Sequence, residues 1–312
     1  MHTLAILLSA PERLSLSRVE LIPAGETDLV VEVDFSGIST GTERLLWTGR
    51  MPHFPGMGYP LVPGYESIGR VVDAGAQMRH RIGERVFVPG STNYVDVRGL
   101  FGGAARRVVV PAARVATLTQ DANADAVLLA LAATAHHALV AASEPIDLII
   151  GHGVLGRLLA RICIAAGHAA PTVWEVNDAR RNGAQGYDVV APQDDARKNY
   201  RSICDVSGDA SILDDLIMRL APGGEIILAG FYDERPNFAF APAFMREMRL
   251  RIAAQWQPQD LAAVQALIAQ NKLDLTGLIT HTQEASTAAQ AYRTAFDDVD
   301  CLKMVLDWRT CS

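Results

Sequence analysis

Three glycines in the middle of the chain have the spacing of a phosphate-binding turn. The G-x-G-x-x-G motif directly follows an expected strand at 148–150 and opens an expected helix at 157–166. In such a turn the first glycine permits the bend, the second lets a pyrophosphate approach the backbone, and the third lets the helix pack on the strand. Unpaired N–H groups at the start of the helix favour the negative charge of a dinucleotide. The motif consists of Gly151, His152, Gly153, Val154, Leu155 and Gly156.

An acidic residue stands where such a motif requires a ribose-binding group. Glu175 ends the next expected strand, 19 residues after Gly156. A carboxylate there accepts hydrogen bonds from the ribose hydroxyls and repels a 2′-phosphate, so we predict NAD as the cofactor in preference to NADP. We count His152 among the cofactor-binding residues because it lies inside the motif. For its side chain we favour a solvent-facing position over one beside the pyrophosphate.

The composition is that of a globular protein with room for two domains. The chain has 312 residues, of which 49% are hydrophobic and 20% charged. Its net charge of −7 repels phosphate backbones, so we expect no nucleic-acid partner. The four cysteines show no C-x-x-C spacing, which fits a reducing compartment.

We expect a cytoplasmic protein with neither a targeting segment nor a transmembrane segment. The first eight residues lack a basic region and are typical of a strand. The longest apolar stretch, 126–142, contains two histidines and falls short of the roughly 18 apolar residues of a membrane span.

Hydrophobic periodicity divides the chain into a β-rich part and an α/β part. Up to about residue 121, short alternating runs predict a mostly antiparallel β domain. After residue 122, apolar strands alternate with helical stretches, which predicts a doubly wound parallel sheet. We assign 122–256 to this sheet domain, and 1–121 together with 257–312 to the β-rich domain. The expected strands of the sheet domain are 147–150, 171–175, 188–191, 204–206, 225–229 and about 250–254.

Three N-terminal motifs resemble those of the medium-chain dehydrogenase/reductase superfamily. They read G-I-S-T-G-T-E at 37–43, P-G-Y-E-S-I-G-R-V-V at 63–72 and I-G-E-R-V at 82–86, in the usual order. The resemblance covers nearly the whole chain and implies a GroES-like catalytic domain with a Rossmann NAD-binding domain. It also implies that Thr134 contacts the nicotinamide, and we add Gly230 to the expected cofactor-binding residues.

The sequence departs from the zinc alcohol dehydrogenases of this superfamily at each metal-ligand position that we place. Ser39 stands about where their first cysteine lies, Tyr65 replaces the histidine of their G-H-E motif, and Ala130 stands near their later ligand. Only Glu66 remains of that motif. A catalytic zinc site requires three protein ligands, so we predict no bound metal.

At finer grain, the segments 36–52 and 54–66 resemble the bacteriochlorophyllide a dehydrogenase family of bacteriochlorophyll biosynthesis. The resemblance implies oxidation of the macrocycle's 3-(1-hydroxyethyl) group to a 3-acetyl group, with NAD⁺ as the hydride acceptor. It implies a bacteriochlorophyllide or related chlorophyllide as the substrate and a location at or near the photosynthetic membrane. The oligomeric state stays open, a homodimer included.

The segment 47–59 is the expected substrate-binding loop. Prolines and glycines interrupt it, so its large apolar side chains cannot all be buried by regular packing and suit a flat apolar ligand. Arg44 and Arg50 are candidate partners for the propionate of a chlorophyllide, and His53 is a candidate to approach its magnesium ion. The alternative is packing at the domain interface, which we favour for His53. The expected substrate-binding residues are Trp47, Arg50, His53, Phe54, Met57 and Tyr59, and the loop also carries Met51.

Without a metal, oxidation of a secondary alcohol requires a side chain that takes the hydroxyl proton as hydride leaves. We favour Tyr65 and His136: a phenol requires a charged neighbour or a relay to act near neutral pH, whereas a histidine titrates in that range. Because neighbouring helix residues face different directions, at most one of His136 and His137 points into a cleft. For Glu66 we favour a paired structural carboxylate over a catalytic group. The full set of catalytic candidates is Tyr65, His136, Ser39, Thr42 and Glu66.

Two other functions remain open from the sequence. One is a zinc-free quinone or enoyl reductase of the same superfamily, which usually prefers NADPH and against which Glu175 argues. The other is a non-catalytic protein that binds NAD(H).

Overall fold

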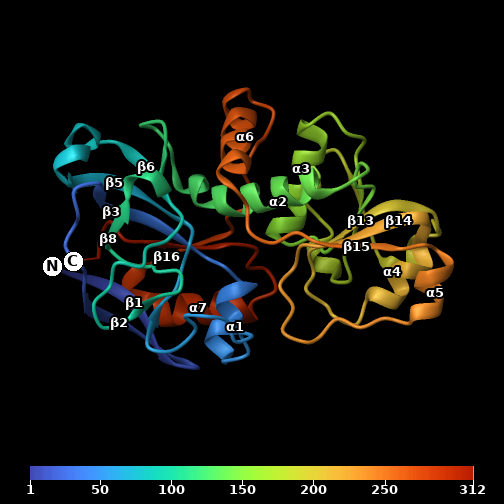
Figure 1. Ribbon diagram of the computed structural model, residues 1–312, viewed down its shortest axis with the longest axis horizontal. Helices are drawn as coiled ribbons and strands as arrows, with labels where there is room; N and C mark the ends of the chain where they lie inside the picture. The colour runs from blue at the N-terminus through green and yellow to red at the C-terminus, as the bar shows by residue number, and fades with distance from the viewer. Residues whose placement is uncertain (312) are drawn as a thin grey trace. The chain divides into compact units, whose positions relative to one another are not determined.

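The computed structural model describes residues 1–311 and divides into two units, each described by itself below (Figure 1). Unit 1 comprises Met1–Ala130 and Leu278–Ser312, and unit 2 comprises Leu131–Gly277. The division therefore falls later in the chain than the expected boundaries at 121 and 256. Unit 2 includes α6 (Pro258–Ala269), which we had assigned to the β-rich domain.

Unit 1 is built on a seven-stranded sheet, mostly antiparallel, and a four-stranded sheet. The strand order in the larger sheet is β16-β17-β3-β5-β6-β9, with β8 also paired to β3. The smaller sheet has the order β2-β1-β4-β7. The strands of unit 1 are β1 (His2–Ala10), β2 (Arg13–Glu20), β3 (Asp28–Ile38), β4 (Leu61–Val62), β5 (Ser67–Ala74), β6 (Arg85–Val88), β7 (Arg98–Gly99), β8 (Arg107–Pro111), β9 (Ala116–Thr117), β16 (His281–Glu284) and β17 (Met304–Asp307).

The last strand of the chain completes the first sheet. β17 pairs antiparallel with β3, with Met304 opposite Ile38 and Asp307 opposite Phe35. This pairing brings the C-terminal residues beside the segment that follows β3. The helices of unit 1 are α1 (Thr42–Thr48) and α7 (Ala288–Asp297), with 3₁₀ turns η1 (Ala76–Arg81), η2 (Ala112–Arg114), η3 (Ala124–Leu128) and η6 (Ala285–Thr287).

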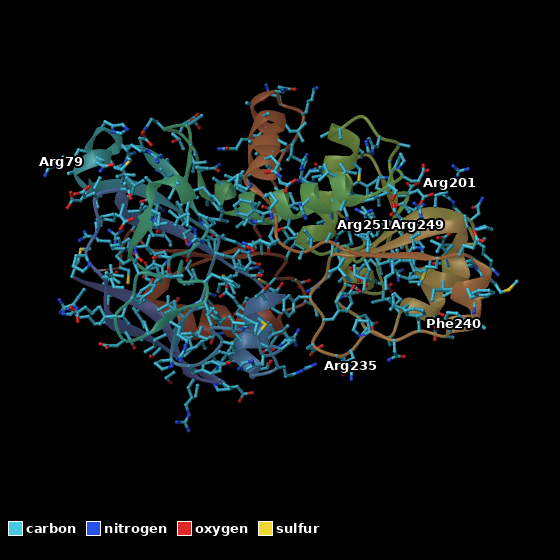
Figure 2. All side chains as sticks on the ribbon, viewed as in Figure 1. Arg79, Arg201, Arg235, Phe240, Arg249 and Arg251 are labelled. Atoms are coloured by element: carbon cyan, nitrogen blue, oxygen red, sulfur yellow. The ribbon has the colours of Figure 1, made fainter. Side chains whose placement is uncertain are left out.

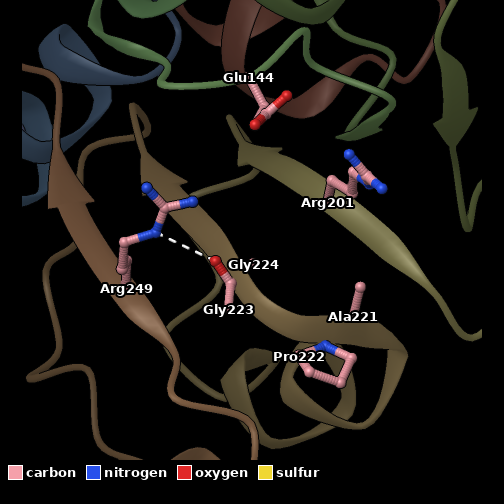
Figure 3. Close-up of a pocket in the computed structure, with 7 residues that line it drawn as sticks. All are labelled: Glu144, Arg201, Ala221, Pro222, Gly223, Gly224 and Arg249. Atoms are coloured by element: carbon pink, nitrogen blue, oxygen red, sulfur yellow. Dashed lines mark hydrogen bonds between the residues drawn. The ribbon is translucent and has the colours of Figure 1, made fainter.

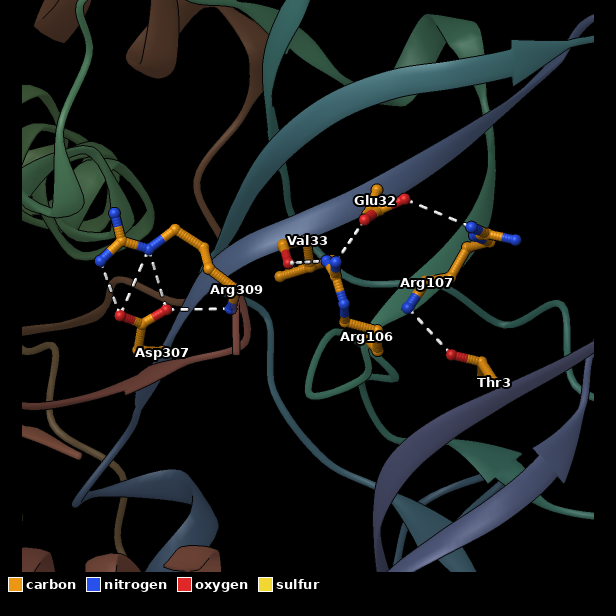
Figure 4. A network of polar contacts seen from close by, with 7 residues as sticks. All are labelled: Thr3, Glu32, Val33, Arg106, Arg107, Asp307 and Arg309. Carbon is orange, nitrogen blue, oxygen red and sulfur yellow. Dashed lines mark hydrogen bonds and ion pairs between the residues drawn. The ribbon is translucent and has the colours of Figure 1, made fainter. Parts of the chain in front are cut away.

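Charged side chains join the strands of unit 1 at its surface (Figure 4). Glu32 on β3 pairs with Arg106 and, at 3.2 Å, with Arg107. The backbone N–H of Arg107 donates to the Thr3 hydroxyl on β1 at 2.9 Å, which links the two sheets. Such partly exposed pairs contribute little energy individually, and the apolar core beneath them carries the stability of the unit.

Unit 2 contains the predicted doubly wound sheet. Its six strands are all parallel and have the order β12-β11-β10-β13-β14-β15, the 3-2-1-4-5-6 arrangement of dinucleotide-binding folds. This confirms the predicted fold class. The strands are β10 (Leu148–Ile150), β11 (Thr172–Trp174), β12 (Asp188–Val190), β13 (Tyr200–Asp205), β14 (Leu220–Leu228) and β15 (Arg249–Ile252).

The connections in unit 2 are uneven. The β11–β12 and β12–β13 connections contain only the 3₁₀ turns η4 (Asp178–Arg180) and η5 (Pro192–Asp194), where helical stretches were expected. α4 and α5 pack on the sheet through one apolar cluster, whereas α3 contacts β10. Besides α6, the helices are α2 (Leu129–Ala141), α3 (Val154–Ala165), α4 (Leu213–Arg219) and α5 (Phe240–Met245).

One helical segment is long and apolar enough to cross a membrane by length and composition. It is Ala124–Ala141, which joins η3 to α2, and half of it is buried inside the protein. Its two histidines bind a carboxylate of α6. These contacts are typical of a core helix.

Candidate functional site

A pair of hydroxyl groups lies where β3 and β5 meet. Ser39 follows β3, Tyr65 precedes β5, and the Ser39 Oγ lies 2.6 Å from the Tyr65 Oη. Thr42, the first residue of α1, also hydrogen-bonds to Tyr65. The structure thus brings together three of the five predicted catalytic residues. Burial and the charge of Glu66 raise the pKa of Tyr65 above its ordinary value, so the phenol keeps its proton at neutral pH.

Glu66 forms a buried ion pair with Lys303, the residue that precedes β17. Both side chains are almost inaccessible to solvent, and the Lys303 Nζ donates to Oε2 of Glu66. A Cβ on Gly37 would lie 2.2 Å from that Oε2, so the strand requires glycine there. Burial raises the pKa of Glu66, and Lys303 partly offsets this. The predicted structural pairing of Glu66 is therefore present, whereas its catalytic role stays a prediction.

A second buried carboxylate, which the sequence analysis did not single out, supports the hydroxyl pair. Glu43 is 1% exposed, and its Oε1 accepts the backbone N–H of Ser39 at 3.0 Å. Its Oε2 accepts the Tyr292 hydroxyl of α7 at 2.6 Å. The pKa of Glu43 is raised to about 7, chiefly by burial and to a smaller extent by the charge of Glu66, while the hydrogen bonds from Tyr292 and Ser39 oppose the rise. The only sequence signal was its place in the 37–43 motif.

The donors of this cluster do not fit a zinc ion. Ser39 and Tyr65 hydrogen-bond to each other, and Glu66 is paired with Lys303. Within residues 1–311, no three His, Cys, Asp or Glu side chains are grouped as metal ligands. Zn²⁺ binds thiolate, imidazole and unpaired carboxylate ligands. We therefore assign no reaction step to a metal, and the absence of bound zinc stays a prediction.

His136 and His137 both bind Asp260. The Nδ1 of His136 lies 2.8 Å from one carboxylate oxygen of Asp260, and the Nδ1 of His137 lies 2.9 Å from the other. The same carboxylate accepts the N–H of Gln257 and caps α6. Both rings therefore reach the same carboxylate although they are neighbours on α2, and the expectation that at most one of them points into a cleft stays a prediction. The catalytic role of His136 stays a prediction.

The glycine motif has the geometry of a phosphate-binding turn. Gly151 has a φ of +99°, which favours glycine, and a Cβ on Gly156 would lie 1.9 Å from the Gly151 carbonyl oxygen. A Cβ on Gly153 meets nothing within 4 Å, so the backbone at the start of α3 is open to a ligand. These residues fit a dinucleotide pyrophosphate.

Glu175 is held at the same edge of the sheet. Its Oε2 accepts the N–H of His152 at 3.0 Å, and its Oε1 accepts the N–H of Asn177 at 2.8 Å. The bond to His152 holds the carboxylate beside the glycine motif, as its place in the sequence predicts. Gly230 donates its N–H to the carbonyl of Asp205 at the carboxyl end of β13. Thr134 lies on α2, half-buried.

The favoured solvent-facing position of His152 is wrong. The residue is 0% exposed, and its ring is held between the Arg180 carbonyl oxygen at 2.6 Å and the Tyr187 hydroxyl at 2.8 Å. Burial lowers its pKa to about 4, so the ring is neutral at neutral pH. It therefore donates from Nδ1 to Arg180 and accepts from Tyr187 at Nε2.

The expected substrate loop is more buried than its sequence suggests. Met51 is 7% exposed and belongs to an apolar cluster with Leu45, Leu46 and Leu61. The remaining large apolar side chains of the loop pack against this cluster: Trp47, Phe54, Met57 and Tyr59. Arg44, Arg50 and His53 are exposed. The packing favours a structural role for most of the apolar groups, and their contact with substrate stays a prediction.

A cavity of about 410 Å³ lies at the amino ends of the parallel strands of unit 2 (Figure 3). Arg201 and Arg249 line it at the starts of β13 and β15, and the Nε of Arg249 donates to the Gly223 carbonyl. Both arginines are exposed at this end of the unit (Figure 2). The glycine motif instead follows the carboxyl end of β10. Because the strands are parallel, the cavity and the glycine motif lie at opposite ends of the strands.

Comparisons with known proteins agree with this geometry. Residues 25–120 match the alcohol dehydrogenase GroES-like domain. A short chain alcohol dehydrogenase from Escherichia coli CFT073, solved with NADH, superposes with a TM-score of 0.83 at 20% identity and covers 98% of this chain and 99% of its own. A dehydrogenase from Sinorhizobium meliloti bound to NADP gives 0.82 at 18% identity, with 99% and 100% covered. These matches establish the alcohol dehydrogenase fold, and the two relatives described next make the chain an oxidoreductase that acts on CH–OH groups.

Two full-length relatives narrow the assignment. The chain is 56% identical over 315 residues to the 2-desacetyl-2-hydroxyethyl bacteriochlorophyllide A dehydrogenase of Cereibacter sphaeroides, with 99% of both chains covered. It is 54% identical over 311 residues to the protein of the same name from Rhodobacter capsulatus, again with 99% of both covered. The chain belongs to this bacteriochlorophyllide dehydrogenase family.

Proposed function

We propose that the protein oxidises the 3-(1-hydroxyethyl) group of bacteriochlorophyllide a, or of a related chlorophyllide, to a 3-acetyl group with NAD⁺. The observation that carries the proposal is the near full-length identity to two relatives of that name. The hydroxyl pair of Ser39 and Tyr65 supports it, because it offers a substrate hydroxyl both a donor and an acceptor.

NAD⁺ is the proposed cofactor because of Glu175. Its carboxylate is fixed beside the phosphate-binding turn by the N–H groups of His152 and Asn177. In that place it repels a 2′-phosphate. When bound, NAD⁺ accepts the hydride that leaves the carbinol carbon.

The side chains proposed to handle the proton are Tyr65 and Ser39. Because the pKa of Tyr65 is raised, it does not act as a standing phenolate. Its hydroxyl instead accepts the proton of the substrate alcohol while it passes its own proton to Ser39, and Thr42 holds the phenol in place. The Ser39 hydroxyl in turn releases its proton to solvent water, so one proton leaves for each hydride transferred. His136 is the alternative base, and its pairing with Asp260 orients its ring.

The decisive experiment is an absorption spectrum of hydroxyethyl bacteriochlorophyllide incubated with the purified protein. It is recorded with NAD⁺ and with NADP⁺, each with and without a zinc chelator. A long-wavelength shift with NAD⁺ that survives chelation is the expected result. No shift, with NAD(H) binding confirmed separately, would refute the proposal and favour the reductase or the non-catalytic alternative.

We further propose a homodimer that works in the cytoplasm at the surface of the photosynthetic membrane. The edge strand β15 supports the dimer, because Leu250 and Ile252 are 42% and 65% exposed and one edge of the strand lacks a neighbour in the described sheet. Light scattering tests the dimer: a monomeric wild type contradicts it, and Ile252→Lys is expected to shift a dimer toward monomer.

The apolar substrate supports the location at the membrane surface, and cell fractionation tests that location.

A further inference from the structure

An aromatic ring that the sequence analysis passed over lies against Tyr65. The Phe101 and Tyr65 ring centroids are 5.6 Å apart with an interplanar angle of 85°, an edge-to-face contact. Phe101 is nevertheless 39% exposed. A large apolar side chain is thus left partly in water beside the hydroxyl pair that we propose to hold the substrate alcohol.

The backbone around Phe101 is fixed from both sides. Its carbonyl oxygen accepts the N–H of Ser91 at 2.8 Å, and a Cβ on Gly90 would lie 2.1 Å from that oxygen. The next residue, Gly102, donates its N–H to Val62 at 2.9 Å and accepts the hydroxyl of the buried Tyr94 at 2.6 Å. The exposed ring therefore sits on an ordered segment that the fold holds in one place.

We infer that Phe101 is a specificity-determining residue, whose exposed ring packs on the conjugated macrocycle of the substrate while the hydroxyethyl group reaches Tyr65 and Ser39. The inference rests on the proposed function. A flat conjugated ligand buries large apolar area and makes favourable ring contacts with an aromatic side chain. A ring held in advance loses little conformational freedom on binding, so its contact contributes directly to affinity and orientation.

The test compares Phe101→Ala, Phe101→Leu and Phe101→Trp with the wild type. Equilibrium binding of hydroxyethyl bacteriochlorophyllide is followed by its absorption change, first without NAD⁺, and kcat/KM is then measured with NAD⁺. We expect Phe101→Ala to raise the pigment Kd roughly tenfold and to lower kcat/KM to match. Phe101→Trp is expected to keep the pigment Kd and kcat/KM close to those of the wild type. The KM for NAD⁺ is expected to stay unchanged in all three variants.

Two comparisons separate the ring contact from general damage. Phe101→Leu keeps apolar bulk without a ring, so it is expected to bind the pigment more weakly than Phe101→Trp even if Phe101→Ala fails to fold. Ile82→Ala is the matched control: Ile82 is 47% exposed in the turn before β6, at the far end of the β5–β6 pair from Ser67. Its pigment affinity is expected to equal that of the wild type.

The results distinguish this inference from the proposed function. A wild type that oxidises the pigment, together with Phe101 variants that bind it within twofold of wild type, overturns the role of Phe101 alone. A wild type that binds without oxidation, with the variants still ranked Trp above Leu and Ala, supports the ring contact and refutes the proposed reaction. A wild type that does not bind the macrocycle overturns both.

Discussion

Replacing Glu43 with glutamine is expected to make the stability of the protein less sensitive to pH. The Glu43 carboxyl is buried, and its pKa rises from an ordinary 4.5 to about 7 on folding. The folded chain therefore binds the Glu43 proton more tightly than the unfolded chain. Below pH 4.5 both states are protonated at this site, and the buried group carries no charge.

The raised pKa of Glu43 makes the free energy of unfolding depend on pH through proton linkage. As pH rises from 4.5 to 7, the unfolded chain loses this proton before the folded chain does, so the free energy of unfolding falls. Each pKa unit is worth about 1.4 kcal/mol, so the contribution of Glu43 declines by about 3 kcal/mol across this interval and stays constant above it. In the variant, the neutral amide has the shape of the carboxyl, and its oxygen accepts the Ser39 N–H as the Glu43 Oε1 does.

The assay is urea unfolding of the wild type and Glu43→Gln at pH 5, 6, 7 and 8. The two proteins are expected to have similar free energies of unfolding at pH 5, and the variant to be about 3 kcal/mol more stable at pH 8. Glu20→Gln is the control, since Glu20 is exposed at the end of β2. A difference between Glu43→Gln and the wild type that is the same at every pH would refute the reasoning.

Three further substitutions test the site. Lys303→Met leaves Glu66 buried without its partner and is expected to lower the free energy of unfolding by about 3–5 kcal/mol in urea, whereas a loss below 1 kcal/mol would contradict the ion pair. Glu175→Ala is expected to raise the KM for NAD⁺ and to relax discrimination against NADP⁺ in steady-state kinetics; an unchanged preference removes the ribose argument. Tyr65→Phe is expected to lower kcat by about 10²-fold or more with the KM for NAD⁺ unchanged, and full activity would eliminate Tyr65 as a proton carrier.

Local patterns were sufficient to predict the α/β sheet. Three features of this sheet depend only on residues within about one βαβ unit, so the sequence predicts them: the strand before Gly151, the glycine spacing and the acid after β11. The connections after β11 and β12 were not predicted, because a helix was expected between each pair of parallel strands and short 3₁₀ turns stand there instead. The glycine and asparagine residues of 176–187 and the proline of 191–199 favour turns over helices, and this local signal was not used.

The dehydrogenase fold, the phosphate-binding turn and the presence of Ser39 and Tyr65 in place of metal ligands could all be predicted from the amino-acid sequence, because each depends on residue types at short spacing. The partners of these residues could not be predicted, because they come from distant parts of the chain. Lys303 lies 237 residues from Glu66, and Tyr292 lies 249 residues from Glu43. These pairs form because β17 returns to β3 and α7 packs in the same unit. Burial then raises the pKa values of Glu43, Tyr65 and Glu66, and how deeply a side chain is buried depends on the folded chain rather than on the spacing of residues along the sequence.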